Sequence, residues 1–390
     1  MDTLSLIQQI RDYEPALVKK IFDLVFVPCT QGRKGKYKYI RAMPTPGTKT
    51  ICREAFYDNK NMEWVIIDKS IQTIGSWAFN GCLSLKSLTI GNSVKIIGEC
   101  AFRGCSSLTH VTIPNSVETI SAYAFAYCSK MTHLTIGNSV TSIGEYAFSY
   151  CSSLTHMTIG ESVETIGDYA FYECSSLTHL TIDNSVTSIG EYAFSYCSSL
   201  THVTIGESVE TIGYGAFDRC SSLTHVTIGN SVETISAYAF YKCSSMIYLI
   251  IGNSVKNIKY SAFNGCSSLT YVTIGNSVET IDNSAFSGCS KLESLTIGNS
   301  IKHIGNYAFY KCSNLPRVTI PNSVKTIETG AFRRCESLTY VTIPDSVKTI
   351  ESRAFYRCSS LREVSIPKHL EKQVEENNVF PEFTEVIVRQ

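Results

Sequence analysis

The sequence has no surplus of charge of either sign, because 34 lysine and arginine residues balance 34 aspartate and glutamate residues. This balance removes a general electrostatic reason to bind nucleic acid or an anionic membrane surface. No stretch approaches the roughly 20 consecutive apolar residues that a membrane-spanning helix needs. The N-terminus also lacks a basic segment followed by an apolar one, so we expect no secretory signal.

Catalytic motifs are missing as well. The sequence contains no phosphate-binding loop ending in Gly-Lys-Ser/Thr, no Gly-x-Ser-x-Gly turn and no metalloprotease His-Glu-x-x-His. Its His, Asp and Glu residues recur at a fixed interval, which aligns them in rows, whereas catalysis needs groups that converge on one point. We therefore expect a protein that is not an enzyme and has no cofactor, no metal and no small-molecule substrate.

What the sequence does contain is a repeat. Thirteen of the sixteen cysteines recur every 23 residues, from Cys82 to Cys358, without an insertion or a deletion. An Ala-Phe dipeptide precedes each of them, and Ala55-Phe56 starts the series with Asn59 in place of the cysteine. Fourteen such units cover residues 48–367, more than four-fifths of the chain. A fixed period of this length predicts a solenoid of stacked units.

The unit that begins at Cys197 shows why the repeats must stack. The stretch from Leu200 to Ile205 ends in alternation of apolar and polar residues and is rich in β-branched side chains, which predicts a short strand. A second extended piece and a short helical turn around Ala216-Phe217 complete the unit. A lone unit of 23 residues cannot enclose its apolar side chains, so each unit depends on its neighbours. The side chains expected to face inward are Leu200, Val203, Ile205, Val209, Ile212, Ala216, Phe217 and Cys220.

The motif from Ile113-Pro114-Asn115-Ser116-Val117 to Ala124-Phe125-x-x-Cys128 resembles the BspA-type leucine-rich repeat position by position. The resemblance covers all 14 units. It implies a right-handed α/β repeat solenoid of horseshoe form, with a parallel β-sheet on the concave face and short strands and helical turns on the convex side. It also implies adhesion or protein binding, often at a cell surface, although this chain departs from that pattern by lacking an export signal.

The two ends do not fit the repeat. In residues 1–47, apolar side chains follow helical spacing as far as Leu24, and Phe26-Val27 continue toward a strand. Residues 368–390 contain a short helical stretch and then a strand-like one. Open solenoid ends expose apolar surface and unpaired strand edges, so we expect both segments to cap the array. The alternative for residues 1–47 is a separate docking module.

The cysteine column, meaning the cysteines at one position of successive repeats, has three interpretations. Neighbouring members are expected about 5 Å apart, within reach of a disulfide. Their inward position after Ala-Phe instead favours small buried free thiols. Metal binding is disfavoured, because no Cys-x-x-Cys pair occurs and ligands in a line do not converge.

A serine column near the strand ends, from Ser70 to Ser346, is expected to form buried hydrogen bonds to loop backbone.

A second column is the candidate binding site. Six of the eight histidines occupy one repeat position, which alternation places on the outward, concave face of the sheet. Large, stiff rings on an exposed face are good contact groups, so the column predicts a stripe that binds a protein partner. The alternatives are recent duplication of repeats, which explains the uniformity without a ligand, and metal capture by neighbouring imidazoles. The predicted stripe consists of Trp64, His110, His133, His156, His179, His202, His225, Tyr248, Tyr271, Arg317 and Tyr340.

The neutral total hides an uneven distribution of charge. Residues 140–240 contain 11 acidic residues against Arg219 alone, whereas residues 302–362 contain ten basic residues against four acidic ones. Head-to-tail association or a partner of mixed charge would follow, and a merely solvated surface is the alternative. The basic run from Gln31 to Arg41 has the composition of a nucleic-acid contact or a targeting signal, but its Gly-x-x-Gly spacing fits a hairpin turn in the cap.

The sequence thus predicts a non-catalytic recognition or scaffold protein that binds a protein partner along its concave face. A cytoplasmic location follows from the missing signal and membrane span. The alternatives are a cell-surface adhesin exported by a non-standard route and a passive structural spacer. No nucleic acid is expected as a partner.

Overall fold

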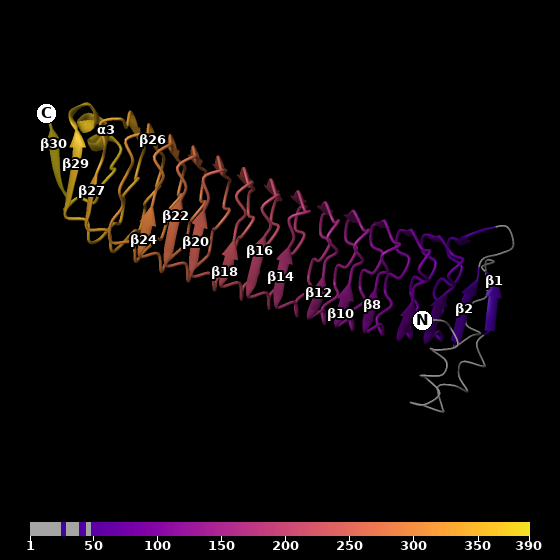
Figure 1. The fold of residues 1–390 in the computed structure, drawn as a ribbon. Coiled ribbons are helices and arrows are strands. Elements are labelled where there is room, and N and C mark those ends of the chain that lie inside the picture. Colours follow the sequence, from indigo (N-terminus) through magenta and orange to yellow (C-terminus); the bar gives the residue numbers. More distant parts are fainter. Residues whose placement is uncertain (1–24, 29–38, 44–47) are drawn as a thin grey trace. The chain divides into compact units, whose positions relative to one another are not determined.

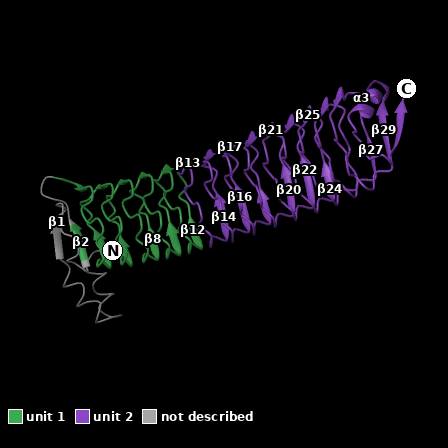
Figure 2. Ribbon diagram, turned by 180° about the vertical axis from the view of Figure 1, so that it is seen from behind, with its two compact units in different colours: residues 1–162 green, residues 163–390 purple. Residues whose placement is uncertain are grey.

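The computed structural model describes residues 25–28, 39–43 and 48–390. Its chain winds in successive coils whose strands lie side by side and point the same way (Figure 1). The residues group into two compact units, Met1–Ser162 and Val163–Gln390, coloured separately in Figure 2.

In the first unit, long strands of three to five residues alternate along the chain with short strands of two residues. The long strands form two parallel sheets, in the orders β1-β2-β4-β6 and β12-β10-β8. The long strands are Val25–Pro28 (β1), Tyr39–Met43 (β2), Trp64–Ile67 (β4), Ser87–Thr89 (β6), His110–Thr112 (β8), His133–Thr135 (β10) and His156–Thr158 (β12), and the short ones are Thr50–Ile51 (β3), Thr73–Ile74 (β5), Ile96–Ile97 (β7), Thr119–Ile120 (β9) and Ser142–Ile143 (β11).

The second unit has the same alternation. Its long strands form one sheet in the order β14-β16-β18-β20-β22-β24 and another in the order β27-β29-β30. The long strands are His179–Ile182 (β14), His202–Ile205 (β16), His225–Thr227 (β18), Tyr248–Ile251 (β20), Tyr271–Ile274 (β22), Ser294–Thr296 (β24), Tyr340–Thr342 (β27), Glu363–Pro367 (β29) and Glu385–Arg389 (β30), and the short ones are Thr165–Ile166 (β13), Ser188–Ile189 (β15), Thr211–Ile212 (β17), Thr234–Ile235 (β19), Asn257–Ile258 (β21), Thr280–Ile281 (β23), His303–Ile304 (β25), Thr326–Ile327 (β26) and Thr349–Ile350 (β28).

The register of the strands turns the sequence repeat into columns. His202 pairs with His225, and Ile212 pairs with Ile235, so each residue lies beside its equivalent 23 residues later. Parallel pairing in this register keeps equivalent side chains on the same face of the sheet. The predicted repeat solenoid with parallel sheets is confirmed.

The core consists of the predicted inward columns. In the coil from Leu200 to Cys220, all eight expected side chains are at most 2% exposed. The phenylalanines form a continuous stack in the second unit, where ring centroids from Phe171 to Phe355 lie 5.1 to 5.4 Å apart. Each large side chain buried in this way contributes on the order of 1.5–3 kcal/mol.

The Ala-Phe segment is a sequence of tight turns that also bonds to the next coil. The Ala216 amide donates to the Gly213 carbonyl at 3.2 Å within the turn, whereas the Phe217 and Arg219 amides donate to the carbonyls of Ala239 and Tyr241 at 2.8 and 2.7 Å. Arg219 has a positive φ of 56°. A non-glycine residue in this region costs about 1–2 kcal/mol, which the hydrogen bonds between coils and the buried ring offset.

The cysteine thiols bond to the backbone of the neighbouring coil. The Cys220 thiol donates to the Phe194 carbonyl at a Sγ–O distance of 3.2 Å, and the Cys266 thiol does so to Phe240 at 3.3 Å. Burial raises the pKa of the Cys266 thiol to about 12, although a hydrogen bond with the Cys243 backbone opposes the shift. The thiol rather than the reactive thiolate is therefore the form that the core holds.

The predicted hydrogen bonds of the serine column are wrong for several of its members. The hydroxyl groups of Ser116, Ser185, Ser323 and Ser346 are buried and make no hydrogen bond with the described chain. The loops do not need them, because a backbone bond already closes each turn, as between the Val117 amide and the Pro114 carbonyl at 3.0 Å.

The two ends carry additional strands. Strand β2 pairs in parallel with β4, and β1 pairs in parallel with β2, so these two strands do not form a hairpin. Most of the basic run from Gln31 to Arg41 lies outside the described residues, as does the helical pattern up to Leu24.

At the other end, Lys368–Leu370 (η1) and Glu371–Glu376 (α3) precede β30, and the Phe380 ring stacks on Phe355 at 5.3 Å. None of the helices in the described part has the length and apolar character that crossing a bilayer requires.

We predict that Phe217→Ala lowers the free energy of unfolding by about 3–5 kcal/mol, because it removes a fully buried ring from the middle of the stack. Denaturant unfolding measures the loss. Tyr271→Ser is the control, since Tyr271 is 44% exposed and Ser294 occupies the same position one repeat later. A loss below about 1 kcal/mol for Phe217→Ala would show that the ring is not part of the core.

We also predict that the thirteen column cysteines resist alkylation in the native protein, whereas Cys52, which is only half-buried, reacts readily. Mass spectrometry after alkylation without reductant counts the reacted cysteines in the native and in the denatured protein. In denaturant, all sixteen cysteines should be alkylated, because the column consists of free thiols. A denatured count near three would reveal a bridged column instead.

Asp218 provides a test of the electrostatics of the turns. Burial raises the pKa of its carboxyl to about 6, although Arg219, the Ser195 hydroxyl and Lys242 oppose the shift. A folded-state pKa above the unfolded one means that stability is lost as pH rises through about 6. We predict that Asp218→Ser is more stable than the native chain by on the order of 1–2 kcal/mol at neutral pH, and that the difference disappears below about pH 4. An equal difference at both pH values would contradict this.

Candidate functional site

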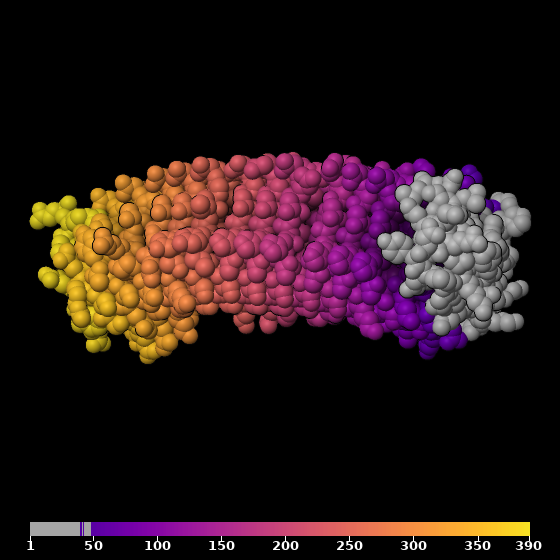
Figure 3. Space-filling view, turned by 60° about the horizontal axis from the view of Figure 1, so that its bottom comes forward, coloured from indigo at the N-terminus to yellow at the C-terminus, as the bar shows by residue number. Residues whose placement is uncertain are grey.

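The predicted stripe lies at the start of the long strands, on their outward face. Its members alternate with buried residues, as in β16, where His202 and Thr204 are exposed and Val203 and Ile205 are buried. The six histidines, Tyr248, Tyr271, Arg317 and Tyr340 are exposed, and Trp64 is half-buried. Rows of side chains from successive repeats are visible along the surface in Figure 3.

In the first unit, three of the histidines form a stack. The rings of His110 and His133 lie 4.6 Å apart between centroids, and those of His133 and His156 lie 4.7 Å apart, with planes within 10° of parallel. Trp64 does not join them, because Ser87 occupies the intervening strand β6. The structure therefore brings together the histidines but not the tryptophan.

In the second unit, the stripe contains two stacks. The rings of His179, His202 and His225 follow one another at 5.3 and 4.9 Å. The Tyr248 ring follows on the adjacent strand, paired in register with His225, and stacks on Tyr271 at 5.0 Å. These five side chains occupy one repeat position on five neighbouring strands.

Hydrogen bonds fix the orientation of the imidazoles. The threonine before each histidine contacts its Nδ1, at 2.9 Å for Thr201 and His202 and 2.8 Å for Thr224 and His225. The Thr224 hydroxyl already donates its proton to the Thr201 carbonyl at 3.0 Å, so its oxygen accepts from Nδ1–H. In the neutral ring, Nε2 is then the unprotonated acceptor. The same two bonds are present at His133, His156 and His202.

This arrangement determines what the stripe can bind. It presents a row of Nε2 acceptors and flat rings to hydrogen-bond donors and apolar groups of a partner. Rings that lie parallel in a row do not converge on one point, as metal coordination requires. Within the described residues, no group of three or more His, Cys, Asp or Glu side chains is placed to hold a metal ion.

An exposed isoleucine extends the apolar part of the stripe. Ile250 is 70% exposed on β20, at a position where the neighbouring strands carry Thr227 and Thr273. It lies two residues from Tyr248, which is 51% exposed. A sequence comparison of the repeats could have identified this site, because Ile250 interrupts a threonine column.

The stripe is interrupted before Arg317. Residue 317 makes only an isolated bridge to Tyr340, although β24 precedes it and β27 follows it in the coil order. The reason is Pro316, which has no N–H to donate to Glu293, whereas Glu293 itself donates to the Thr270 carbonyl at 2.9 Å. A hollow of about 700 Å³ lies here, lined by Arg317, Tyr340, Asp345 and Arg389 among others.

Strand β2 adds a position that the repeat pattern did not identify. Tyr39 pairs with Trp64 in the register of the sheet, so the stripe position continues one strand further toward the N-terminus. The spacing from Tyr39 to Trp64 is 25 residues instead of 23, which hid this strand from a strict search for the repeat.

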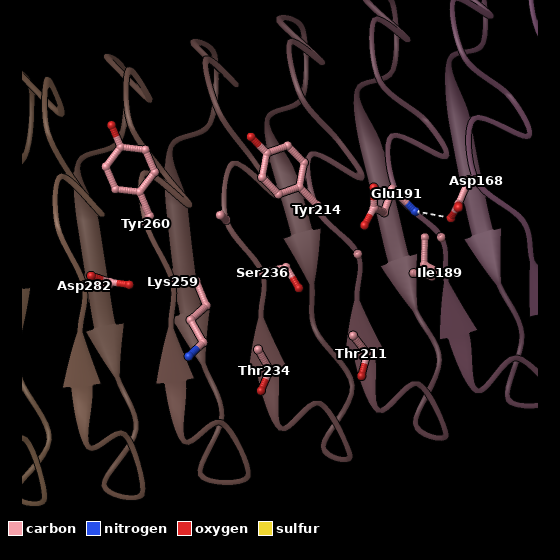
Figure 4. Close-up of a pocket in the computed structure, with 13 residues that line it drawn as sticks. Asp168, Ile189, Glu191, Thr211, Tyr214, Thr234, Ser236, Lys259, Tyr260 and Asp282 are labelled. Carbon is pink, nitrogen blue, oxygen red and sulfur yellow. Dashed lines mark hydrogen bonds between the residues drawn. The ribbon is translucent and has the colours of Figure 1, made fainter.

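A groove on a different face is the second candidate site. It has a volume of about 520 Å³ and crosses several coils of the second unit beside the short strands β17 and β19. Figure 4 shows the Tyr214 and Tyr260 side chains projecting from alternate coils, with Ser236 from the coil between them. Carboxylates line both ends of the groove, Asp168 and Glu191 at one and Asp282 at the other. Gly190, Gly213 and Ser236 of this groove occupy one repeat position, but a column of small residues does not by itself predict a hollow in the surface, so sequence reasoning missed it.

The histidine stack predicts a loss of stability on acidification. Partial desolvation within the stack and the neighbouring charges of His110 and His156 lower the pKa of His133. Because the unfolded chain binds protons at higher pH than the folded one, the stability of the neutral stack is present above pH ~6.5 and is lost as pH falls through the folded-state pKa. Thermal unfolding at about pH 7.5 and 5.5 tests this against a chain with glutamine at all six stripe histidines. Equal losses for the two chains would mean that the stack is not sensitive to pH.

Comparison with known proteins agrees with this geometry. The family model described as the BspA type leucine rich repeat region matches residues 49–178, 118–247, 164–293 and 284–381, so the matches span most of the chain. Proteins with this solenoid fold are typically not catalysts. No functionally curated protein matches the sequence.

Two solved structures are similar over most of their length. A leucine-rich repeat protein from Bacteroides ovatus has 27% sequence identity, a TM-score of 0.77 and coverage of 94% of this chain and 92% of its own. A leucine rich cell surface protein from Faecalibacterium prausnitzii has 30% identity, a TM-score of 0.49 and coverage of 90% of this chain and 89% of its own. The match of the family model across the repeats identifies the chain as a member of the BspA-type leucine-rich repeat family.

Proposed function

We propose that the chain is a recognition protein that binds a protein partner through the outward face of its long strands, the face predicted to be concave. The contact residues are those of the stripe, with Ile250 added to them. The protein contributes no catalysis in this role. Its partner offers hydrogen-bond donors to the imidazoles and apolar groups to the tyrosines and the isoleucine.

The observation that carries this proposal is the fixed row of rings in the second unit. Hydrogen bonds to Thr201 and Thr224 hold two of the imidazoles, and stacking holds the tyrosines. Side chains that are ordered before binding lose little conformational entropy when a partner docks. Tyrosine is also among the residues enriched at the energetic centres of interfaces.

Two locations are compatible with this function. We propose a cytoplasmic scaffold as the first, and a cell-surface adhesin as the alternative, since members of the family are often associated with surfaces. Fractionation of the source cell with an antibody to the chain distinguishes them.

We also propose that residues 368–390 cap the array, since Leu370, Val379 and the Phe380 ring continue its core. The capping role of residues 1–47 stays a prediction.

A photo-crosslinking experiment tests the binding face. A crosslinking amino acid at Tyr271 is predicted to capture a protein partner saturably in source-cell extract, whereas the same amino acid at the exposed Thr187, just before the short strand β15, is not. Tyr248→Ser combined with Ile250→Thr should abolish the capture, since serine and threonine occur at the equivalent positions Ser294 and Thr273. The partner should also dissociate on acidification, because a protonated imidazole has no acceptor nitrogen to offer it.

Several results would count against the proposal. Equal capture from positions 271 and 187 would indicate non-specific contact. Capture that survives the double substitution would move the site to another face. If neither position captures a saturable partner, the passive-spacer alternative is favoured instead.

A further inference from the structure

The outward side chains of the Ala-Phe turns in the second unit form a surface that we name the turn face. Contacts between rings show that its positions are neighbours in space. The Tyr192, Tyr214, Tyr238 and Tyr260 rings follow one another at 5.3, 5.3 and 5.2 Å, and Tyr241 packs edge-on against Tyr238 at 5.3 Å. A run of tyrosines therefore extends from the N-terminal part of the turn face to its centre, with Arg219 and Lys242 among them at the repeat position of Glu173.

The N-terminal end of the turn face is acidic. Asp168 and Glu191 occupy one repeat position in adjacent coils and are exposed, and Glu173 is half-buried beside them. The Asp168 carboxylate accepts a hydrogen bond from the Glu191 amide at 2.7 Å, but no ion pair neutralises these three carboxylates within the described residues. Arg219 lies further along the face and is beside Asp218, with 3.8 Å between Nε and Oδ1.

The C-terminal end of the turn face is basic. Lys311, Arg334 and Arg357 occupy one repeat position in three successive coils. The Arg333 guanidinium lies 5.9 Å from the Tyr310 ring centroid and 5.5 Å from that of Tyr356, so the two rings hold it between them. Arg353 and Arg357 also lie over the Tyr356 ring, at 5.9 and 5.5 Å.

These five cations lack carboxylate partners within the described part of the unit. Glu328 and Glu351 lie near this end, but they accept hydrogen bonds from Asn306 and Thr329 at 2.9 Å. The Arg333 Nε is buried without a hydrogen-bond partner. Like charges in neighbouring coils repel one another, so the basic end is stabilised by any surface that brings carboxylates to it.

We propose that the turn face is the interface of a symmetric dimer, in which a second copy of this chain binds antiparallel to the first. A face that is acidic at one end and basic at the other becomes complementary to itself after rotation by 180°. The acidic end of each copy then lies on the basic end of the other. Arg219 falls opposite Lys311 in this alignment, but the Asp218 carboxylate beside it offsets its charge. The spacing of the charges also matches between the two copies, because both ends carry them on successive coils that are the same distance apart.

The centre of the turn face supports the same arrangement. The Tyr260 side chain is 43% exposed and lies close to the midpoint between Glu173 and Arg357. Beside it is the groove over Ser236 and Ala237, which is open to receive a ring from the second copy. Glu173 and Arg357 are eight repeats apart, which is about 38 Å at the usual strand spacing and is long enough for an interface of standard size. Tyrosine at the centre and charge at the rim is the usual anatomy of such an interface.

Sedimentation velocity with charge-reversal variants tests the proposal. The native chain is expected to be a dimer at low salt and to dissociate as salt increases. Arg334→Glu with Arg357→Glu should weaken the dimer about tenfold or more, and so should Glu173→Lys with Glu191→Lys. Glutamate and lysine already occur at the position of Arg334, as Glu173 and Lys311, so these changes there are compatible with the fold. Lys325→Glu with Lys348→Glu is the control, because it changes the net charge equally but lies outside the turn face.

Mixing the two reversal variants gives the decisive result. Each variant alone is predicted to dimerise only weakly. The variant with two added glutamates and the variant with two added lysines should form a heterodimer, since both end contacts are again between opposite charges. The proposal is overturned if the native chain is monomeric at about 100 μM in low salt, if assembly continues beyond two copies, if the control weakens the dimer equally, or if mixing restores nothing. The stripe is not part of this surface, so partner capture at Tyr271 reports on the proposed function separately.

Discussion

The rest of the structure depends on the parallel pairing of each coil with the coil 23 residues further along the chain. This pairing satisfies backbone groups of the strands and of the turns. Residues 202–204 of β16 pair with residues 225–227 of β18, and the Phe217 amide donates to the Ala239 carbonyl. It also places every side chain beside its equivalent, so the properties of one position are repeated along a whole column. The buried phenylalanines, the thiols and the exposed imidazoles are all consequences of this one register.

Columns favour apolar groups and create a difficulty for charged ones. Identical buried rings stack well, whereas identical exposed charges repel one another at about 5 Å. The sequence reduces this repulsion in different ways at different positions. From Glu233 to Lys302, the position before the short strands alternates in charge, and the Lys256 and Lys302 ammonium groups pair with Glu233 and Glu279 at 3.0 and 2.6 Å. On the turn face the like charges remain together, and in the stripe neutral imidazoles replace them. A partner can contribute most at the turn face and at the stripe, because the described part of the chain leaves their charges and hydrogen-bond acceptors without partners.

Most of the core and the strands could be predicted from the sequence, because a strict repeat makes each coil a copy of the next. The inward positions of Val203 and Phe217 and the outward position of His202 follow from alternation alone. The exceptions arise where one residue changes the backbone or where contacts cross repeat positions. Pro316 removes a single donor and interrupts a sheet, β2 follows a spacing of 25 residues, and the tyrosine run on the turn face joins rings from two different repeat positions. The uncompensated serine hydroxyls show that a repeated polar residue need not form a bonded ladder.

Register, rather than composition, stabilises the stacked coils. A pair of deletions in the second unit distinguishes the effect of register from that of composition. Removing residues 220–242 deletes one complete repeat and joins Arg219 to Cys243, which restores every column. Removing residues 220–241 deletes one residue fewer. After the junction, each outward position then follows the register of an inward position in the coil before it. In denaturant unfolding, the longer deletion is predicted to leave a cooperative transition close to that of the native chain, and the shorter one to lower the free energy of unfolding by several kcal/mol or to split the transition. Equal stability of the two variants would contradict the central role of the register.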